Sequence, residues 1–154
     1  RIINGWSSTA GLIIAGSSNN SGYLSEIRKL SEGKNIRIIA KSLSDSEAEE
    51  LIRGAAGLIV FHSNPNTIVS GSFFFGASCG AYILALKTDF LEFIYEHNQY
   101  EGLIVVSSIE ELNCAISELS QLENKLSPEE LYEQASINFG FSVVADSWTK
   151  LLTF

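Results

Sequence analysis

The stretch Thr67–Leu86, TIVSGSFFFGASCGAYILAL, indicates the fold class because a polar turn, a short apolar helix and a strand follow one another directly. The segment after the Ser70–Ser72 turn would place apolar side chains on every side of a helix, so we expect that helix between two other layers. Gly76 would let a neighbouring backbone approach closely, and Gly80 would end the helix. Unpaired N–H groups in the first turn of such a helix favour an anion, although a buried helix also needs small residues at its start.

Apolar runs of strand length alternate with longer amphipathic segments along the chain. The runs that predict strands covered on both faces are Leu12–Ala15, Ile36–Ile39, Leu58–Phe61, Tyr82–Leu86 and Leu103–Val106. Helices are predicted at Tyr23–Glu32, Ser46–Ala56, Ser72–Cys79, Phe90–His97, Ile109–Leu122, Glu129–Asn138 and Ser142–Leu152. This alternation predicts an α/β fold, Rossmann-like and three-layered, with a parallel, doubly wound sheet. We expect one domain over residues 1–154, with terminal helices over 127–154.

Serines followed three residues later by a glutamate mark three of the predicted helix starts. The pairs are Ser44 with Glu47, Ser107 with Glu110 and Ser127 with Glu130. Such pairs form capping boxes, in which each side chain satisfies a backbone N–H of the other residue. We therefore interpret these glutamates as helix starts and not as catalytic carboxylates.

The composition argues against several classes of function. A formal net charge of −8 disfavours nucleic acids and anionic membranes as partners. No apolar run reaches the roughly 18 residues of a spanning helix, so we expect no transmembrane segment. Cys79 and Cys114 lack CxxC spacing and predict buried thiols in a reducing compartment. His62 and His97 share no ligand-like spacing with acidic residues, so we expect no metal site.

Three well-known motifs of phosphate binding and catalysis are absent from the sequence. It contains no P-loop, no Gly-x-Gly-x-x-Gly after the first strand and no Gly-x-Ser-x-Gly elbow. No histidine is expected to pair with Ser70 or Ser72, which disfavours a serine hydrolase. The chain starts at Arg1 and contains no methionine, which favours a fragment of a larger polypeptide.

The loops that follow the predicted strands are rich in Gly, Ser, Asn and Thr. They begin after Ala15, Ile39, Phe61, Leu86 and Val106. Ligands of open α/β sheets bind beyond the carboxyl ends of the strands, where the strand order reverses. We therefore expect these loops and the start of the Ser72–Cys79 helix to surround one binding site.

The order of these pieces resembles the C-terminal nucleotide-sugar-binding domain of GT-B glycosyltransferases, most closely the retaining, family-4-like enzymes that build bacterial polysaccharides. The resemblance rests on LIIAG at Leu12–Gly16, the segment Ile36–Ser63, Thr67–Ala85, DFLEFI at Asp89–Ile94 and GLIVVSSIEELNCAI at Gly102–Ile116. It implies a donor-binding domain, the C-terminal half of a GT-B architecture, for a glycosyltransferase of polysaccharide or glycoconjugate synthesis. The implied partners are a nucleotide-diphosphate sugar as donor substrate, with no further cofactor, and an N-terminal acceptor-binding domain of the same polypeptide.

The resemblance also implies positions for the donor. Gly16 and Ser17 would lie by the diphosphate or the sugar, and the backbone of Lys41, Ser42 and Leu43 by the base. The turn of Ser70, Gly71 and Ser72 would hold the diphosphate. Thr67 falls where many relatives have the first glutamate of an E-x7-E motif. Catalytic residues are not assigned, and the fragment without its N-terminal domain should be inert.

Two positions depart from the family pattern. Phe75 stands where the second glutamate of the motif contacts ribose in relatives, and no Arg and Lys pair precedes LIIAG. These departures favour a rival interpretation, a non-catalytic α/β scaffold or interaction domain. A receiver-type domain is less favoured because Gly16–Asn20 contains no acidic cluster. The resemblance implies a cytoplasmic protein, either free or peripheral to the inner membrane through the missing domain.

Overall fold

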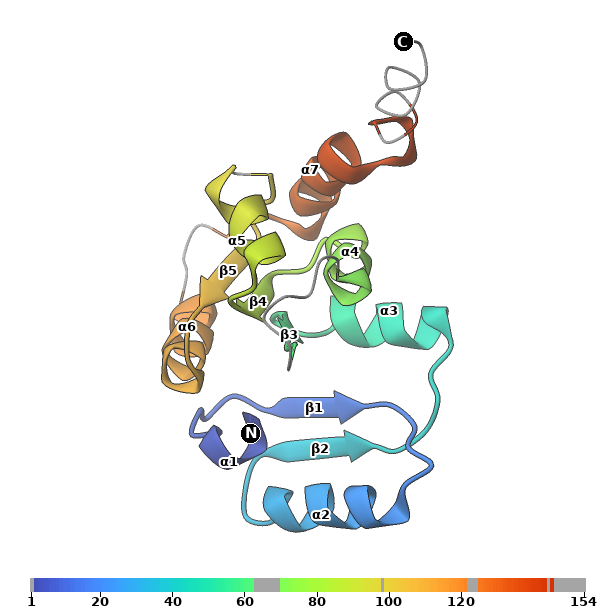
Figure 1. Cartoon of the computed structure of the whole chain (residues 1–154), viewed down its shortest axis with the longest axis vertical. Coiled ribbons are helices and arrows are strands. Elements are labelled where there is room, and N and C mark those ends of the chain that lie inside the picture. Colours follow the sequence, from blue (N-terminus) through green and yellow to red (C-terminus); the bar gives the residue numbers. More distant parts are fainter. Residues whose placement is uncertain (1, 63–69, 98, 122–124, 144, 146–154) are drawn as a thin grey trace.

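A computed structural model describes residues 2–62, 70–97, 99–121, 125–143 and 145 (Figure 1). The strands are β1 (Leu12–Ala15), β2 (Ile36–Ile39), β3 (Leu58–Val60), β4 (Ile83–Leu86) and β5 (Leu103–Val106). The helices are α1 (Ile2–Gly5), α2 (Ser21–Ser31), α3 (Asp45–Arg53), α4 (Gly71–Ser78), α5 (Asp89–Glu96), α6 (Ile109–Gln121) and α7 (Pro128–Phe139). The predicted α/β class is confirmed. The sequence did not predict α1, and most of the predicted helix Ser142–Leu152 lies outside the described residues.

Every pairing between these strands is parallel, as predicted, but the pairings fall into two sheets. Strand β1 pairs with β2, and β3, β4 and β5 form a separate sheet in that order. Figure 1 shows the β1–β2 pair with α1 and α2 as a unit beside the β3–β5 sheet. The five strands therefore do not form the single continuous sheet that the sequence predicts, because no backbone hydrogen bond joins β1 to β3 within the described residues.

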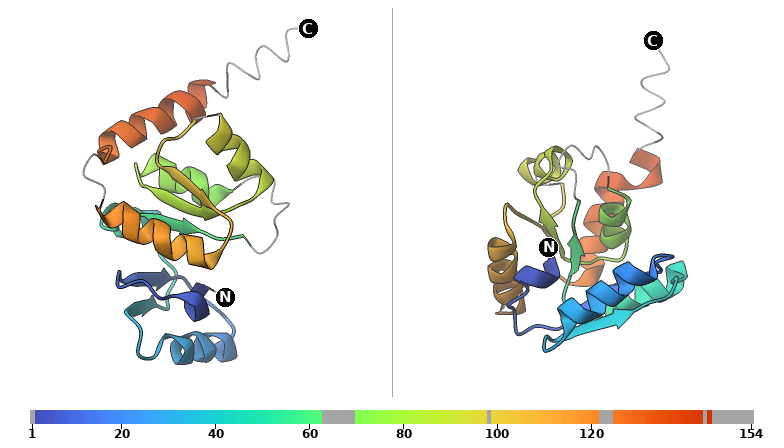
Figure 2. Two further views of the ribbon diagram at one scale, coloured as in Figure 1. Left: turned by 90° about the vertical axis from the view of Figure 1, so that its left-hand side faces the viewer. Right: turned by 60° about the horizontal axis from the view of Figure 1, so that its bottom comes forward.

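Helices cover both faces of the β3–β5 sheet. Figure 2 shows α6 on one side of this sheet and α4 on the other. A hydrophobic core lies on each face of the sheet, and successive side chains of β4 point into one and then the other. Ile83 packs in the core on the α4 side, and Leu84 packs in the core under α6. The sheet with its helices is thus a three-layer unit, and the apolar pattern of β4 follows from burial on both faces.

Helix α4 packs between the β3–β5 sheet and α7, as expected from its apolar composition, and it buries Phe73, Gly76 and Ala77. The ring of Phe73 is fully buried and makes edge contacts with four neighbouring aromatic rings, those of Phe74, Phe90, Tyr100 and Phe139. A Cβ on Gly76 would lie 2.7 Å from Leu58 Cδ2, so the absence of a side chain lets α4 approach β3. The aromatic cluster holds α4, α5 and α7 together.

Gly80 ends α4 in the left-handed conformation that its sequence position predicts. Its φ is +67°, and the amides of Gly80 and Ala81 donate to the carbonyls of Ala77 and Gly76. This is the hydrogen-bond pattern of a Schellman motif. A Cβ at Gly80 would also lie 2.0 Å from the carbonyl oxygen of Pro128, so α7 can begin directly against this turn.

Two of the three predicted capping boxes are confirmed. Ser44 with Glu47 begins α3, and Ser127 with Glu130 begins α7 with Pro128 in its first turn. The prediction for α6 was wrong by one position. Ser108 Oγ accepts from the amide of Glu111, whose carboxylate accepts from the amide of Ser107. Either serine of the Ser107-Ser108 pair suits a cap, so the sequence alone did not fix which one begins the helix.

The unit that contains β1 and β2 has little core of its own. Between Ile2 and Ile59, only Trp6 and Ser31 are buried. Helix α1 ties the units together, because the carbonyl of Gly5 accepts from Asn113 of α6, and the carbonyl of Ile3 accepts from Lys34 next to β2. Among the helices of the described residues, none combines the length and apolar character needed to cross a bilayer.

Candidate functional site

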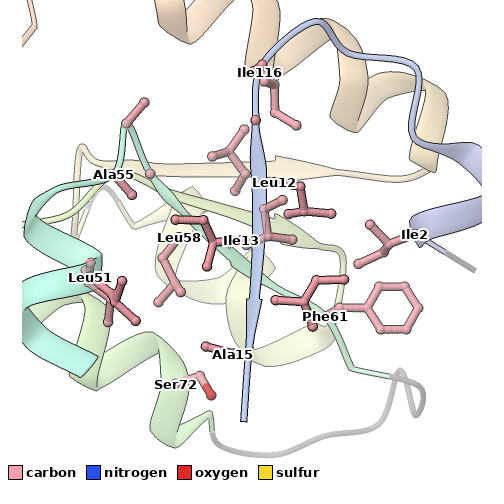
Figure 3. A pocket seen from close by; sticks show the side chains of 18 of the residues that line it. Ile2, Leu12, Ile13, Ala15, Leu51, Ala55, Leu58, Phe61, Ser72 and Ile116 are labelled. Carbon is pink, nitrogen blue, oxygen red and sulfur yellow. The ribbon is translucent and has the colours of Figure 1, made fainter. Parts of the chain in front are cut away.

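A cavity of about 930 Å³ lies between the β1–β2 pair and the β3–β5 sheet. Its walls are mostly aliphatic and aromatic side chains from β1, β3, α3 and α6, among them Leu12, Ile13, Leu51, Leu58, Phe61 and Ile116 (Figure 3). A cavity of this size could hold a drug-sized ligand. However, its lining offers few polar side chains that could orient one.

One end of the cavity meets the segments that the sequence assigns to ligand binding. Figure 3 shows Ala15, at the carboxyl end of β1, and Ser72, in the first turn of α4, at the same end of the cavity. Leu43, in the loop after β2, and Phe75 also belong to the lining. The structure therefore brings Leu43 and Ser72, two of the predicted site residues, to one cavity.

The first turn of α4 presents free backbone donors. Ser70 is the N-cap, and its Oγ accepts from the amide of Phe73 at 3.1 Å. The amides of Gly71 and Ser72 donate to no acceptor within the described part of the chain. A Cβ on Gly71 would meet nothing within 4 Å, so the space beside this turn is open. A helix start with free amides beside open space is suited to an anion, and the anion site predicted here stays a prediction.

His62 provides a contact that the sequence analysis missed. Its Nε2 lies 2.9 Å from Ser70 Oγ, which corrects the expectation that no histidine pairs with this serine. The signal was present, because His62 follows β3 and Ser70 precedes α4, so the two residues flank one connection. Ser70 is only 1% exposed, and its Oγ already caps the helix, so the hydroxyl is not presented to a substrate as a nucleophile.

Gly16 and Ser17 follow β1 and are exposed. Gly16 has a φ of +150°, and a Cβ there would meet nothing within 4 Å. Its amide already donates to the carbonyl of Ile39 at 3.0 Å, in continuation of the β1–β2 ladder. Gly16 therefore offers open space for a ligand but no free N–H group.

Lys41, Ser42 and Leu43 connect β2 to α3. The Lys41 ammonium lies 2.5 Å from a carboxylate oxygen of Glu47, and the Lys41 amide donates to Ile39. The hydrogen bond from Lys41, together with the capping contacts from Ser44, lowers the pKa of Glu47 to about 2. The charge of Lys41 is thus directed at the α3 start, while Ser42 is exposed and Leu43 faces the cavity.

Two further positions complete the predicted set. Thr67 lies outside the described residues. Phe75, at the position of the relatives' second glutamate, is half-buried and lines the cavity. Within the described ranges, no group of three His, Cys, Asp or Glu side chains is arranged to hold a metal ion. Comparisons of the chain with models of protein families, with curated proteins and with solved structures found no match.

Proposed function

We propose that this chain is the donor-binding domain of a glycosyltransferase and that it binds the diphosphate of a nucleotide sugar at the start of α4. The observation that carries the proposal is the pair of free amides at Gly71 and Ser72, beside open space. Helix N-termini attract phosphate through unpaired N–H groups and the helix dipole. The resemblance to GT-B enzymes adds the sugar nucleotide as the class of ligand.

The position of this turn supports a ligand that spans several loops. Ser72 shares its end of the cavity with Ala15, which leads into Gly16 and Ser17. A diphosphate at α4 would therefore have its sugar or nucleoside portion beside the loop after β1. Leu43, in the loop after β2, lines the same cavity, and the backbone of this loop would contact the base.

The proposed chemistry is stabilisation of a leaving group. When the bond between the sugar and the diphosphate breaks, negative charge grows on the phosphate oxygen. Fixed amides at Gly71 and Ser72 would bind that charge more strongly than they bind the intact donor, which lowers the barrier. The acceptor and any group that takes its proton would belong to the N-terminal domain of the same polypeptide, and the domain alone would be inactive.

A second candidate function is a non-catalytic α/β scaffold, and Phe75 favours it. This aromatic ring lines the cavity where the family pattern places a ribose-binding carboxylate. The charge of Lys41 is also paired with that of Glu47. A scaffold derived from the same fold would keep the parallel strands and lose affinity for nucleotides.

Calorimetric titration with UDP, GDP and their sugars tests the proposal directly. Gly71→Val should weaken binding by about ten- to a hundredfold, because the branched side chain would keep a phosphate from the two amides. The substitution should leave the fold intact, since Gly71 is exposed and a Cβ there meets no neighbouring atom. Glu129→Ala, at the exposed start of α7, is the matched control and should not change affinity.

Circular dichroism would establish that each variant is folded. Equal affinities of the original chain and Gly71→Val would exclude the α4 turn as the diphosphate site. If the original chain binds none of these nucleotides, the scaffold function is favoured. Repeating the titration with a polypeptide that includes an N-terminal domain would then show whether that domain completes the site.

A further inference from the structure

The free edges of β1 and β3 face the same cavity. In a parallel ladder, alternate residues direct their N–H and C=O groups to opposite edges of the strand. The amide of Leu12 donates to Asn35, just before β2, and that of Gly16 donates to Ile39 of β2, so the backbone groups of Ile13 and Ala15 face away from β2. The amide of Leu58 bonds to Tyr82 beside β4, which directs the backbone of Ile59 to the opposite edge of β3.

These outward-facing positions all contribute to the cavity lining. Ile13 and Ala15 line it from β1, as do their neighbours Leu12 and Ile14. Ile59 and Leu58 line it from β3, and Phe61 follows that strand. No residue of β2 lines the cavity. The two sheets therefore face each other across the cavity through β1 and β3. Each of these strands has one edge whose backbone donors and acceptors pair with no other described strand.

The burial of the apolar strands is unequal although their sequences are alike. Strand β4, ILAL, has three fully buried residues, whereas β1, LIIA, has none, and the side chain of Ile13 is 44% exposed. Helix α3 likewise buries no residue, although its Leu51 and Ile52 line the cavity. Apolar residues on both faces of a strand are typical of a strand inside a sheet and not of an exposed edge.

Trp6 adds an independent sign of incomplete packing at the same place. It lines the cavity, and its Nε1 is the one buried side-chain nitrogen or oxygen without a hydrogen-bond partner in the described part of the chain. Buried donors without partners are rare in fully packed proteins. This atom is itself covered, so a ligand in the cavity could not reach it unless the surrounding side chains moved.

From these observations we infer that the cavity closes. Strand β1 moves edge to edge against β3 and joins the two sheets into one, in the order β2-β1-β3-β4-β5. Closure pairs the backbone groups of both edges, which an apolar ligand in the cavity would leave unpaired. It also buries the aliphatic side chains of β1 and α3, which favours the closed form. This inference does not depend on nucleotide binding.

Closure has a defined consequence for the loops. In the joined sheet, the strand order reverses between β1 and β3, and the crevice at such a reversal lies beyond the carboxyl ends of both strands. Gly16 follows β1 there, and His62 follows β3. The closed form would therefore place the loop after β1 beside the His62–Ser70 contact and the free amides of α4.

Amide hydrogen exchange of the full chain, followed by NMR, tests the inference residue by residue. Closure predicts that the amides of Ile13, Ala15 and Ile59 exchange within about tenfold of the rate of Ile14, which faces β2 in either arrangement. Nuclear Overhauser contacts between β1 and β3 should accompany this protection. Rapid exchange at Ile13 and Ala15, with Ile14 protected, would overturn the inference.

Two further measurements separate closure from other sources of protection. Protection that appears only at protein concentrations where light scattering detects a dimer would mean that β1 pairs with a second copy, which also overturns closure. Ala15→Pro removes one N–H group from the edge of β1 that would pair with β3. A proline is tolerated on the free edge of a sheet but not within a hydrogen-bonded ladder. Closure predicts that the amide of Ile59 exchanges at least about tenfold faster in this variant than in the original chain. Unchanged exchange at Ile59 in Ala15→Pro would contradict the pairing of β1 with β3.

Discussion

The imidazole Nε2 of His62 lies 2.9 Å from the hydroxyl oxygen of Ser70, and this contact joins the end of β3 to the start of α4. Ser70 Oγ also accepts from the amide of Phe73, so one buried hydroxyl contacts both the helix start and His62, the second residue after the strand. The contact thereby positions the free amides of Gly71 and Ser72 relative to the β3–β5 sheet.

Ser70→Ala should lower the free energy of unfolding by about 1–2 kcal/mol, because the amide of Phe73 loses its acceptor in a buried place. Ser127→Ala, which removes the cap of α7 at a more exposed position, is the matched comparison and should cost about 1 kcal/mol or less. Urea denaturation of both variants measures the difference. A Ser70→Ala variant as stable as the original chain would show that this cap contributes nothing.

Gly80→Ala should destabilise the protein by more than about 2 kcal/mol, because a left-handed residue with a side chain costs about 1–2 kcal/mol before any clash is counted. The new Cβ would in addition lie 2.0 Å from the Pro128 carbonyl oxygen and force α7 away from the turn. Gly71→Ala is the control. A Cβ on Gly71 would enter open space at a helix start, so we expect the midpoint of thermal unfolding of Gly71→Ala to stay close to that of the original chain.

Tyr100→Phe tests a buried hydrogen bond of the aromatic cluster. The Tyr100 hydroxyl donates to the carbonyl of Ala81 at 2.6 Å, and burial raises the pKa of this phenol well above its usual range. Removing the hydroxyl leaves the buried carbonyl without this donor, at a cost of about 1–3 kcal/mol. Tyr132→Phe, at a side chain that is 49% exposed, should be nearly neutral in the same denaturation experiment.

The α3 capping box should weaken in acid. The pKa of Glu47 in the folded chain is about 2, below the ordinary value of 4.5, chiefly because Lys41 donates to its carboxylate. A lowered folded pKa means that the stabilisation is complete above about pH 4.5 and is lost as the pH falls toward about 2. The stability advantage of the original chain over Glu47→Gln should therefore shrink across this interval. An advantage that is constant from about pH 6 to about pH 2.5 would contradict the assignment.

The sequence determined the local elements of this protein. Three of the five strands, β1, β2 and β5, begin and end at the predicted residues, because short β-branched runs between turn residues have few other stable conformations. The end of α4 at Gly80 and the caps at Ser44 and Ser127 also follow from local chemistry, since each needs only residues within one helical turn. The free amides of the α4 start were predictable for the same reason.

Tertiary structure alone decided which edges and side chains meet. The apolar run Leu12–Ala15 predicts a buried strand, but no local pattern states whether β1 pairs with β3 or faces it across a cavity. The His62–Ser70 contact likewise joins residues that are eight positions apart, which no helical or strand period brings together. Local hydrogen bonds and capping depend on neighbouring residues, whereas strand pairing and side-chain contacts across the fold depend on how separate elements pack, and that is set by the whole chain.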